Sequence, residues 1–276
     1  MLKLVLGRLN SGKTTYIQTL IKDCVRKGQS RAILLVPEQF SFESEKRMIR
    51  LLGEKAALEV EVCGFSRLAQ NIVGENQPLR RLDDAGMIAL MSTALEQTAD
   101  KLSVYGKYAK STAVISEMLT VSTELKQGAV TPEMLEDSAR KLPDGMLKNK
   151  LNDLSLVTAA FDALVAQSFS DERDLLTVLA HKLEEEHYFK NATVFVDGFK
   201  GFTAQEIEIL SHIIAQSNDT YISLCTDKIY GDEYDISPFA CVRATARKLI
   251  DTAKKRNVSV GQVTPPGFDG RYKSKA

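Results

Sequence analysis

The sequence lacks an excess of either charge. Lys and Arg together number 36, Asp and Glu also number 36, and the formal net charge of the 276 residues is zero. Bulk positive charge is the usual electrostatic signature of a protein that coats nucleic acid. That class of protein is therefore excluded, and any nucleic-acid track in this chain has to be a local feature.

Long apolar runs and grouped metal ligands are also missing. No run approaches the roughly 20 apolar residues that cross a bilayer, so we expect no membrane span. The cysteines are far apart without a C-x-x-C pair, and the histidines share no ligand-like spacing, so no metal centre or cluster held by cysteine or histidine is predicted. They are Cys24, Cys63, Cys225 and Cys241, with His181, His187 and His212. Scattered cysteines without a signal peptide indicate a reducing compartment, and we expect a cytoplasmic protein.

A complete phosphate-binding motif, G-x-x-x-x-G-K-T, occupies residues 7–14. A strand-like run at residues 2–6 precedes it and a helix-like segment begins at Thr14, which is the setting that the motif requires. Glycines let the backbone wrap a phosphate, and N–H groups at the helix start favour anionic oxygens. The alternative is a glycine-rich turn before an ordinary helix. The residues predicted to bind a nucleotide here are Gly7, Asn10, Ser11, Gly12, Lys13 and Thr14.

Two stretches of alternating strand and helix patterns flank a purely helical one. Apolar and alternating runs predict strands at residues 33–36, 58–63, 193–196, 221–224 and 258–260. From about residue 82 to 186 apolar positions recur at helical spacing, which predicts five or six helices. Crossover connections would join the strands into one parallel sheet. We therefore predict an α/β fold with a large all-helical insertion, divided into residues 1–80, 81–190 and 191–276.

Some element boundaries carry clear signals. Asp83 is a plausible N-cap, and Thr131 should cap a helix whose first position is Pro132. Helices are predicted at residues 41–52 and 204–216 within the α/β part. The alternation of apolar and acidic residues at 58–63 indicates a strand nearer a sheet edge.

The apolar run at residues 194–196 ends in Asp197, far downstream of the phosphate-binding motif. In ATPases such a carboxylate holds Mg²⁺ together with the hydroxyl that follows the motif lysine. We therefore predict that Thr14 and Asp197 bind Mg²⁺ and that Asp197 belongs to the nucleotide site. A motor ATPase usually places a glutamate after this aspartate; here Gly198 follows, so hydrolysis should be slow. The alternative for Asp197 is a turn residue at a strand end.

Three polar loops that follow predicted strands each carry a phenylalanine beside a hydrogen-bonding or cationic neighbour. Such loops suit single-stranded nucleic acid, because bases stack on rings while phosphates meet cations and backbone N–H groups. The alternative for each phenylalanine is that it packs in the core beneath its loop. The residues predicted to contact DNA are Gln39, Phe65, Arg67, Phe199 and Phe202.

In combination these motifs resemble a known family. The stretches that carry the likeness are residues 7–14, 35–39 (L-V-P-E-Q), 65–69 (F-S-R-L-A) and 196–199 (V-D-G-F), with 83–87 and 124–126 in support. They resemble the amino-terminal region of the AddB (RexB) family, whose members are subunits of the bacterial AddAB (RexAB) helicase–nuclease. The resemblance runs from residue 1 to about residue 260.

The resemblance implies a superfamily 1 helicase-like, RecA-like P-loop domain with a helical subdomain inserted into it. It implies ATP bound at the phosphate loop, an AddA-type motor and nuclease subunit as partner in a heterodimer, and DNA as substrate. The complex resects double-strand breaks for recombinational repair, and its AddB-type member reads a Chi-type sequence as single-stranded DNA. A nuclease domain and an iron–sulfur cluster are implied only in the carboxyl-terminal part, which is missing here because family members are several times longer.

The resemblance therefore indicates a truncated fragment that binds ATP with little turnover, although the parent complex is an ATP-dependent helicase and deoxyribonuclease. Two other classes remain open at this point. One is a free-standing P-loop kinase or NTPase. The long helical insertion and the sparse arginines argue against this class. The other is a catalytically silent scaffold with a vestigial P-loop, which the missing glutamate after Asp197 favours and the intact Lys13 and Thr14 oppose.

Overall fold

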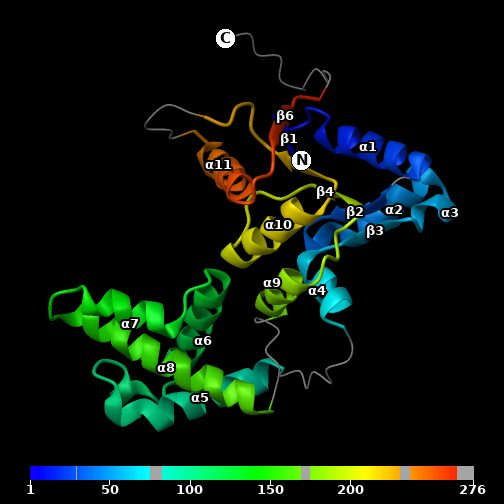
Figure 1. Cartoon of the computed structure of the whole chain (residues 1–276). Coiled ribbons are helices and arrows are strands. Elements are labelled where there is room, and N and C mark those ends of the chain that lie inside the picture. Colours follow the sequence, from blue (N-terminus) through cyan, green and yellow to red (C-terminus); the bar gives the residue numbers. More distant parts are fainter. Residues whose placement is uncertain (29, 75–82, 169–174, 231–236, 266–276) are drawn as a thin grey trace. The chain divides into compact units, whose positions relative to one another are not determined.

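The computed structural model describes residues 1–28, 30–74, 83–168, 175–230 and 237–265. Its six strands form one parallel sheet in the order β3-β2-β4-β5-β1-β6 (Figure 1). The strands are β1 (Leu2–Leu6), β2 (Arg31–Leu35), β3 (Val60–Cys63), β4 (Ala192–Val196), β5 (Asp219–Leu224) and β6 (Val260–Val263). The predicted α/β class with a parallel sheet and a helical insertion is confirmed.

Helices connect the strands and fill the segment between β3 and β4. They are α1 (Lys13–Lys27), α2 (Ser41–Leu52), α3 (Glu54–Ala57), α4 (Phe65–Val73), α5 (Asp84–Thr98), α6 (Thr112–Gln127), α7 (Pro132–Arg140), α8 (Met146–Ser168), α9 (Leu175–Glu185), α10 (Ala204–Gln216) and α11 (Ala240–Lys255). Short 3₁₀ turns are η1 (Glu38–Phe40), η2 (Ala99–Lys101) and η3 (Gly106–Tyr108).

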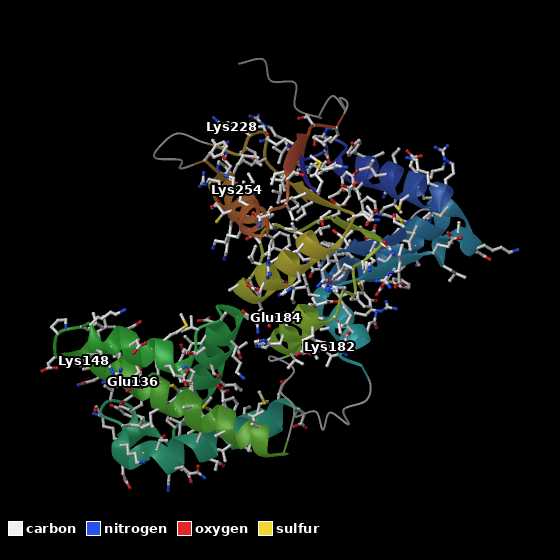
Figure 2. All side chains as sticks on the ribbon, viewed as in Figure 1. Glu136, Lys148, Lys182, Glu184, Lys228 and Lys254 are labelled. Carbon is white, nitrogen blue, oxygen red and sulfur yellow. The ribbon has the colours of Figure 1, made fainter. Side chains whose placement is uncertain are left out.

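The chain divides into two compact units. Met1–Gly74 together with Val178–Ala276 form the sheet unit, and Glu75–Thr177 form the helical unit. The boundary predicted between residues 80 and 81 lies outside the described residues. Most of α9 belongs to the sheet unit, where the Lys182 ammonium donates to the Ile72 carbonyl at 2.6 Å and fastens α9 to the end of α4 (Figure 2).

One face of the sheet packs against α1 and α2. Alternate residues of each strand point to this face, because successive side chains of a strand point to opposite sides. Val5, Leu34 and Phe195 from three different strands form a buried cluster with Ile17 of α1 and Met48 of α2. This cluster fixes α1, and with it the loop that connects β1 to α1, over the carboxyl edge of the sheet.

Helices α10 and α11 lie on the other face of the sheet (Figure 1). Helix α10 begins with a capping box: Thr203 Oγ1 accepts the Glu206 N–H at 3.2 Å, and Glu206 accepts the Thr203 N–H at 2.7 Å. Most of α10 is buried, including the polar His212. Burial lowers the pKa of the His212 imidazole below its ordinary value.

The helical unit has a core of its own. Met91 and Leu95 of α5, Met118 of α6 and Phe161 of α8 are buried in one cluster. The predicted caps are confirmed: Asp83 accepts the Gly86 N–H at 2.8 Å, and Thr131 accepts the Met134 N–H at 3.3 Å ahead of Pro132. Charged side chains such as Glu136 and Lys148 project from α7 and α8 (Figure 2).

Asp153 of α8 is a buried acid in the helical unit, with 2% of its surface exposed. Its Oδ1 accepts the Ser103 N–H at 2.9 Å, and its Oδ2 accepts the N–H groups of Val104 at 2.7 Å and Tyr105 at 3.1 Å. Both carboxylate oxygens are therefore satisfied by backbone. The contact pins the loop between η2 and η3 onto α8.

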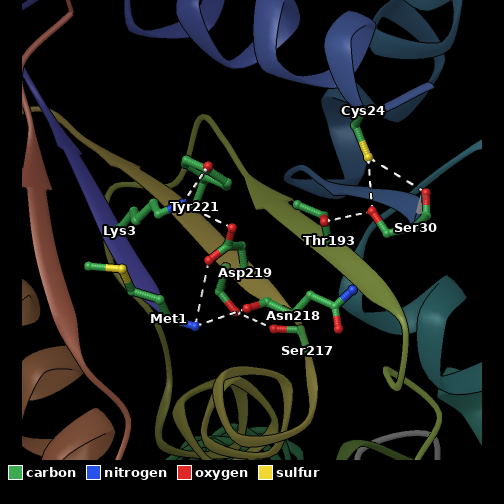
Figure 3. A network of polar contacts seen from close by, with 10 residues as sticks. Met1, Lys3, Cys24, Ser30, Thr193, Ser217, Asn218, Asp219 and Tyr221 are labelled. Atoms are coloured by element: carbon green, nitrogen blue, oxygen red, sulfur yellow. Dashed lines mark hydrogen bonds and ion pairs between the residues drawn. The ribbon is translucent and has the colours of Figure 1, made fainter. Parts of the chain in front are cut away.

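The amino edge of the sheet is closed by a polar network (Figure 3). Lys3 Nζ donates to Asp219 at 2.9 Å and to the Tyr221 hydroxyl at 2.8 Å, and the Met1 ammonium donates to the Asn218 carbonyl at 3.0 Å. Burial alone would lower the pKa of Lys3, but its hydrogen bonds to Tyr221 and Asp219 outweigh burial and raise it.

The last strand differs from the sequence prediction, which placed it at residues 258–260. The structure begins β6 at Val260 and continues to Val263. The Val258 N–H donates to the Ala253 carbonyl at 2.9 Å and closes the end of α11. Because this N–H is bonded to the helix, Val258 is not part of the strand. Strand β3 lies at the opposite edge of the sheet, as its alternating apolar and acidic pattern predicted.

Candidate functional site

The loop between β1 and α1 adopts a compact, left-turning conformation. Asn10 has φ +60° and Gly12 has φ +81°, values that L side chains adopt rarely. The Ser11 N–H donates to the Arg8 carbonyl at 3.2 Å and tightens the turn. A Cβ on Gly7 would lie 2.0 Å from Ser11 Oγ, so only glycine fits where the strand enters the loop.

Lys13 is the first residue of α1, and its side chain lies back along the loop. Its Nζ donates to the Gly7 and Arg8 carbonyls, both at 2.8 Å. Burial lowers the pKa of the Lys13 ammonium below the ordinary lysine value, while Cys225 and Asp197 act in the opposite direction. The ammonium is therefore held by carbonyl oxygens of its own loop, and it lies within electrostatic reach of Cys225 and Asp197 at the carboxyl edge of the sheet.

Asp197 follows β4 directly and lies at the same edge. Its carboxylate is largely buried, with 9% of the residue exposed, and it accepts a hydrogen bond from the hydroxyl of Ser223 on β5. Strand β5 lies between β4 and β1, so Ser223 stands between Asp197 and the loop that begins at Gly7. Parallel strands bring their carboxyl ends to one edge, and this is why residues so far apart in sequence meet here.

The loop and the strand ends enclose a pocket of about 600 Å³. The sequence-predicted residues Asn10, Ser11, Gly12, Lys13, Thr14, Asp197 and Phe199 line it, joined by Leu9, Thr15, Gly198, Lys200, Ser223 and Cys225. Pockets that hold small molecules usually measure about 300–1,000 Å³. The structure thus brings the predicted nucleotide and metal residues together in one pocket, except for Gly7, which does not line it.

A second, smaller pocket of about 210 Å³ adjoins the first and shares Thr14, Asp197 and Gly198 with it. Its floor is apolar and comes from α1, β2 and α2, and its rim carries polar side chains of α1 and α2. The lining residues are Thr14, Ile17, Gln18, Leu34, Val36, Phe40, Glu43, Ser44, Arg47, Met48, Asp197 and Gly198.

Gln39 and Arg67 lie on exposed turns after β2 and β3. Gln39 is an exposed residue of η1. Arg67 lies on the first turn of α4, where its side chain is 56% exposed and pairs with Glu45 of α2 at 2.7 Å. Both side chains are accessible to a ligand, although Arg67 would exchange or share its pairing with Glu45.

The three predicted DNA-contacting phenylalanines form one aromatic cluster. The Phe65 ring meets Phe199 at 5.5 Å and Phe202 at 6.3 Å between ring centroids, edge to face, and Phe199 lies 5.0 Å from Phe202. Phe65 is 4% exposed, which favours the packing interpretation for this ring. Phe199 and Phe202 are only partly buried, so part of each ring remains accessible.

Two functional contacts were not foreseen from the sequence. Glu38, within the V-P-E-Q stretch, accepts the Ser66 N–H at 2.8 Å and so caps α4, the helix that carries Arg67. Ser223 holds Asp197. A signal for Ser223 existed, since it is a serine between Ile222 and Leu224 near the end of a predicted buried strand. Glu38 gave none, because its partner lies 28 residues further on.

In the part of the chain that the structure describes, no three His, Cys, Asp or Glu side chains converge as metal ligands. Among the described helices, none combines the length and the apolar character that a membrane crossing needs.

The fold and the site define the class, a RecA-like parallel α/β domain that carries a helical insertion. A family model described as "ADDB, N-terminal" matches residues 4–276. The chain belongs to this AddB amino-terminal family.

Relatives of the chain are named as the B subunit of an ATP-dependent helicase/deoxyribonuclease. The relative from Clostridium tetani (strain Massachusetts / E88) is 32% identical over 282 residues, which cover 99% of this chain and 24% of the relative. That from Clostridium kluyveri (strain NBRC 12016) is 32% identical over 262 residues, 93% of this chain and 23% of the relative. A Clostridium botulinum relative (strain Hall) is 31% identical over 284 residues, which cover 100% of this chain and 24% of the relative. The chain spans about a quarter of the length of these curated relatives.

Proposed function

We propose that this chain is the nucleotide-binding, DNA-contacting amino-terminal domain of an AddB-type subunit. The parent enzyme would be an ATP-dependent helicase–deoxyribonuclease that processes double-strand breaks for recombinational repair. One observation carries the proposal: the loop of residues 7–14 and Asp197, distant in sequence, line a single pocket of about 600 Å³. The relatives, which are named as the B subunit of an ATP-dependent helicase/deoxyribonuclease, support the parent activity.

The donor set of this pocket fits ATP with Mg²⁺. The absent Cβ of Gly7 and the left-handed backbone at Asn10 and Gly12 leave the loop N–H groups free of side-chain obstruction around an anion. Lys13 would exchange its carbonyl contacts for phosphate oxygens, and Thr14 with Asp197 would hold the metal. Mg²⁺, when bound, neutralises charge on the phosphate oxygens.

Turnover by this domain should be very slow. The residue after Asp197 is Gly198, whose backbone is left-handed at φ +85° and packs against Pro37. A glycine supplies no carboxylate to orient an attacking water. An arginine finger from a second domain, worth about 10³–10⁵ in rate, is not part of the chain's proposed site either. A turnover of several per second by the purified chain would contradict this.

Titration of Mg·ATP into the 276-residue chain tests the nucleotide assignment. Lys13→Ala removes a charge-assisted contact worth about 1.5–3 kcal/mol, so affinity should fall roughly tenfold or more. Lys3→Ala is the matched control, because Lys3 lies on the same strand–loop segment but at the amino edge of the sheet. Equal affinity of wild type and Lys13→Ala would overturn the assignment and favour a scaffold with a vestigial loop.

We propose that single-stranded DNA runs over the loops at the carboxyl edge. Gln39 and Arg67 offer polar contacts, and the accessible parts of Phe199 and Phe202 offer faces for bases, each worth about 1–3 kcal/mol. Phe65 supports these two rings from below and belongs to the surface only in that sense. Because the net charge is zero, affinity should be weak and its salt dependence shallow.

Two substitutions test the DNA surface. Arg67→Ala and Phe202→Ala should each weaken binding of a fluorescent single strand while leaving the melting temperature close to that of wild type. Arg140→Ala is the matched control, since Arg140 is also an exposed arginine paired with a glutamate, on α7 of the helical unit. If neither variant changes DNA affinity, or both unfold the domain, the surface is wrongly assigned.

The partner follows from the same proposal. The relatives are named as one subunit of an enzyme, which implies at least one further subunit. We propose an AddA-type motor and nuclease as partner in a cytoplasmic heterodimer. Co-purification of the longer parent protein with such a motor, and DNA-end processing by the pair, would test this. Absence of any complex between the two would count against it.

A further inference from the structure

We propose that Ser223 is a positioning residue for the divalent cation that accompanies the nucleotide. Its hydroxyl would fix one oxygen of the Asp197 carboxylate and so aim the other oxygen at the cation. The inference rests on the proposed nucleotide function and assigns a role to a residue that the motifs do not include.

The sheet register places Ser223 between β1, which leads into the phosphate-binding loop, and β4, which leads into Asp197. Ser223 pairs with Val5 of β1, two residues before Gly7, and its hydroxyl donates to Asp197 beyond β4. Neighbours in register share a face of the sheet. Ser223 and Asp197 therefore point to the face that α1 covers, the helix that begins with Lys13 and Thr14.

A hydroxyl at this position is chemically conspicuous. The positions at the same level of the sheet on β1 and directly after β2 are the buried Val5 and Val36, and Ser223 itself is only 4% exposed. A buried hydroxyl costs free energy unless it is hydrogen-bonded, so packing alone favours valine here. The Asp197 carboxylate supplies the hydrogen bond that makes the serine acceptable.

The bonding of Asp197 differs from that of a carboxylate with a purely structural role. Asp153 in the helical unit has both oxygens satisfied, by three backbone N–H groups. Among the described residues, Ser223 is the side chain that donates to Asp197, and it does so to Oδ1. The second oxygen belongs to a carboxylate that lines the same pocket as Thr14. A carboxylate that is held through one oxygen and lines a pocket suits a cation or its bound water.

Residues that orient a metal ligand typically change metal affinity about 10–100-fold when removed. The expected signature is therefore specific to the metal. Ser223→Ala should leave the affinity for a non-hydrolysable ATP analogue in EDTA close to wild type. It should reduce the gain in affinity that excess Mg²⁺ confers by roughly tenfold. Ser223→Thr, which keeps the hydroxyl, should retain the gain.

Thr193→Val is the matched control. Thr193 lies on β4 at the amino edge, and its hydroxyl bonds Ser30 Oγ at 2.9 Å (Figure 3). This variant loses a strand hydroxyl and a hydrogen bond as Ser223→Ala does, but far from the pocket, and it should keep the full Mg²⁺ effect. In an Asp197→Ala background, Ser223→Ala should cause no further loss, because the two residues act as one unit.

Isothermal titration calorimetry of each variant, with MgCl₂ or EDTA present, decides the matter. An unchanged Mg²⁺ effect in Ser223→Ala, or an equal loss in Thr193→Val, would overturn the inference. If Ser223→Ala does not fold, Ser223→Cys serves instead, and a full Mg²⁺ effect with this weaker donor would overturn it. If wild type binds no nucleotide at all, the proposed function fails and the inference falls with it.

Discussion

Lys3 and Lys13 lie at opposite ends of one strand–loop segment, and their surroundings differ in kind. At the amino edge the Lys3 ammonium meets a carboxylate and a phenol hydroxyl, and these hydrogen bonds raise its pKa despite burial (Figure 3). At the carboxyl edge the Lys13 ammonium meets the carbonyls of its own loop, and burial lowers its pKa. The fold therefore gives Lys3 an oppositely charged partner, whereas it holds Lys13 mainly through neutral carbonyl groups of its own loop.

The same contrast separates two buried acids. Asp153 in the helical unit is saturated by backbone donors, whereas Asp197 in the sheet unit has one described side-chain donor. A carboxylate whose two oxygens both accept hydrogen bonds stabilises the folded structure. A carboxylate with an oxygen left for a ligand suits a binding site, and such sites are often kept at some cost to stability. The comparison teaches that the hydrogen bonds of Asp153 and of the amino edge serve the fold, while Asp197 at the carboxyl edge lines a pocket in which we propose that a ligand binds.

The largest effect should come from Asp153→Ala. The change removes the shared acceptor of three partly buried N–H groups. Leaving a buried group unsatisfied costs about 1–3 kcal/mol, so the helical unit should lose about 3 kcal/mol. Urea unfolding followed by circular dichroism would measure the loss, and amide exchange at Ser103 to Tyr105 would locate it. Asp137→Ala on the exposed side of α7 is the control. Equal stability of the two variants would break the comparison.

Lys3→Met and Lys13→Met should separate stability from binding. At neutral pH Lys3→Met should lower the free energy of unfolding by about 1 kcal/mol and leave nucleotide affinity intact. Because the folded pKa of Lys3 is raised, its contribution is complete below the ordinary value of about 10.5 and disappears only as the pH rises through the folded pKa. Lys13→Met should lower the nucleotide affinity and change the free energy of unfolding little. A larger stability loss in Lys13→Met would refute the contrast.

The buried His212 on α10 should make the sheet unit sensitive to acid. Burial is the largest influence lowering the His212 pKa, and the charged Arg256 and nearby His181 act in the same direction. Glu208 and Glu184 act against them. The unfolded chain therefore takes up a proton more readily, and stability should fall as the pH drops below about 6.5.

His212→Leu should flatten this dependence, and His187→Leu, at an exposed position, should leave it unchanged. Melting temperatures between neutral pH and about pH 5 would show the slope. A slope that persists in His212→Leu would assign the acid sensitivity to other groups.

The smallest effect is a difference in thiol reactivity. Burial raises the pKa of the Cys63 thiol to about 12, so this cysteine should resist alkylation, whereas the exposed Cys241 should react readily. Cys225 lines the pocket that we propose binds the nucleotide, so Mg·ATP should slow its labelling while leaving Cys241 unaffected. Mass spectrometry of iodoacetamide adducts would measure the rates. Unaltered labelling of Cys225 at saturating Mg·ATP would contradict the placement of the ligand.

The sequence pattern predicted the sheet well because buried parallel strands are short apolar runs with little ambiguity. Helix α2 (Ser41–Leu52) and helix α10 (Ala204–Gln216) have the predicted bounds, since both begin and end at clear signals. The meeting of Asp197 with the phosphate-binding loop was also predictable, because parallel strands share one carboxyl edge. Strand β6 was misplaced by two residues, because the backbone of Val258 is taken by α11.

Contacts between loops that are distant in the sequence could not be predicted from the sequence. A phenylalanine after a strand is compatible both with stacking and with packing, and only the fold shows that Phe65 is buried while Phe199 and Phe202 are partly open. The pairing of Arg67 with Glu45 is of the same kind, since it depends on how α2 and α4 lie together. Such contacts follow from three-dimensional packing and leave no local pattern.

The capping of α4 by Glu38 has a consequence for how this protein can vary. A Cβ on Gly64 would lie 2.2–2.3 Å from the atoms of the Glu38 carboxyl group, so the glycine and the glutamate occupy one shared space. Any side chain at position 64 therefore forces Glu38 off the helix start, and loss of Glu38 removes the constraint on position 64. The two positions are therefore expected to be epistatic: a change at Gly64 costs the cap of α4 when Glu38 is present and costs less when Glu38 has already been replaced.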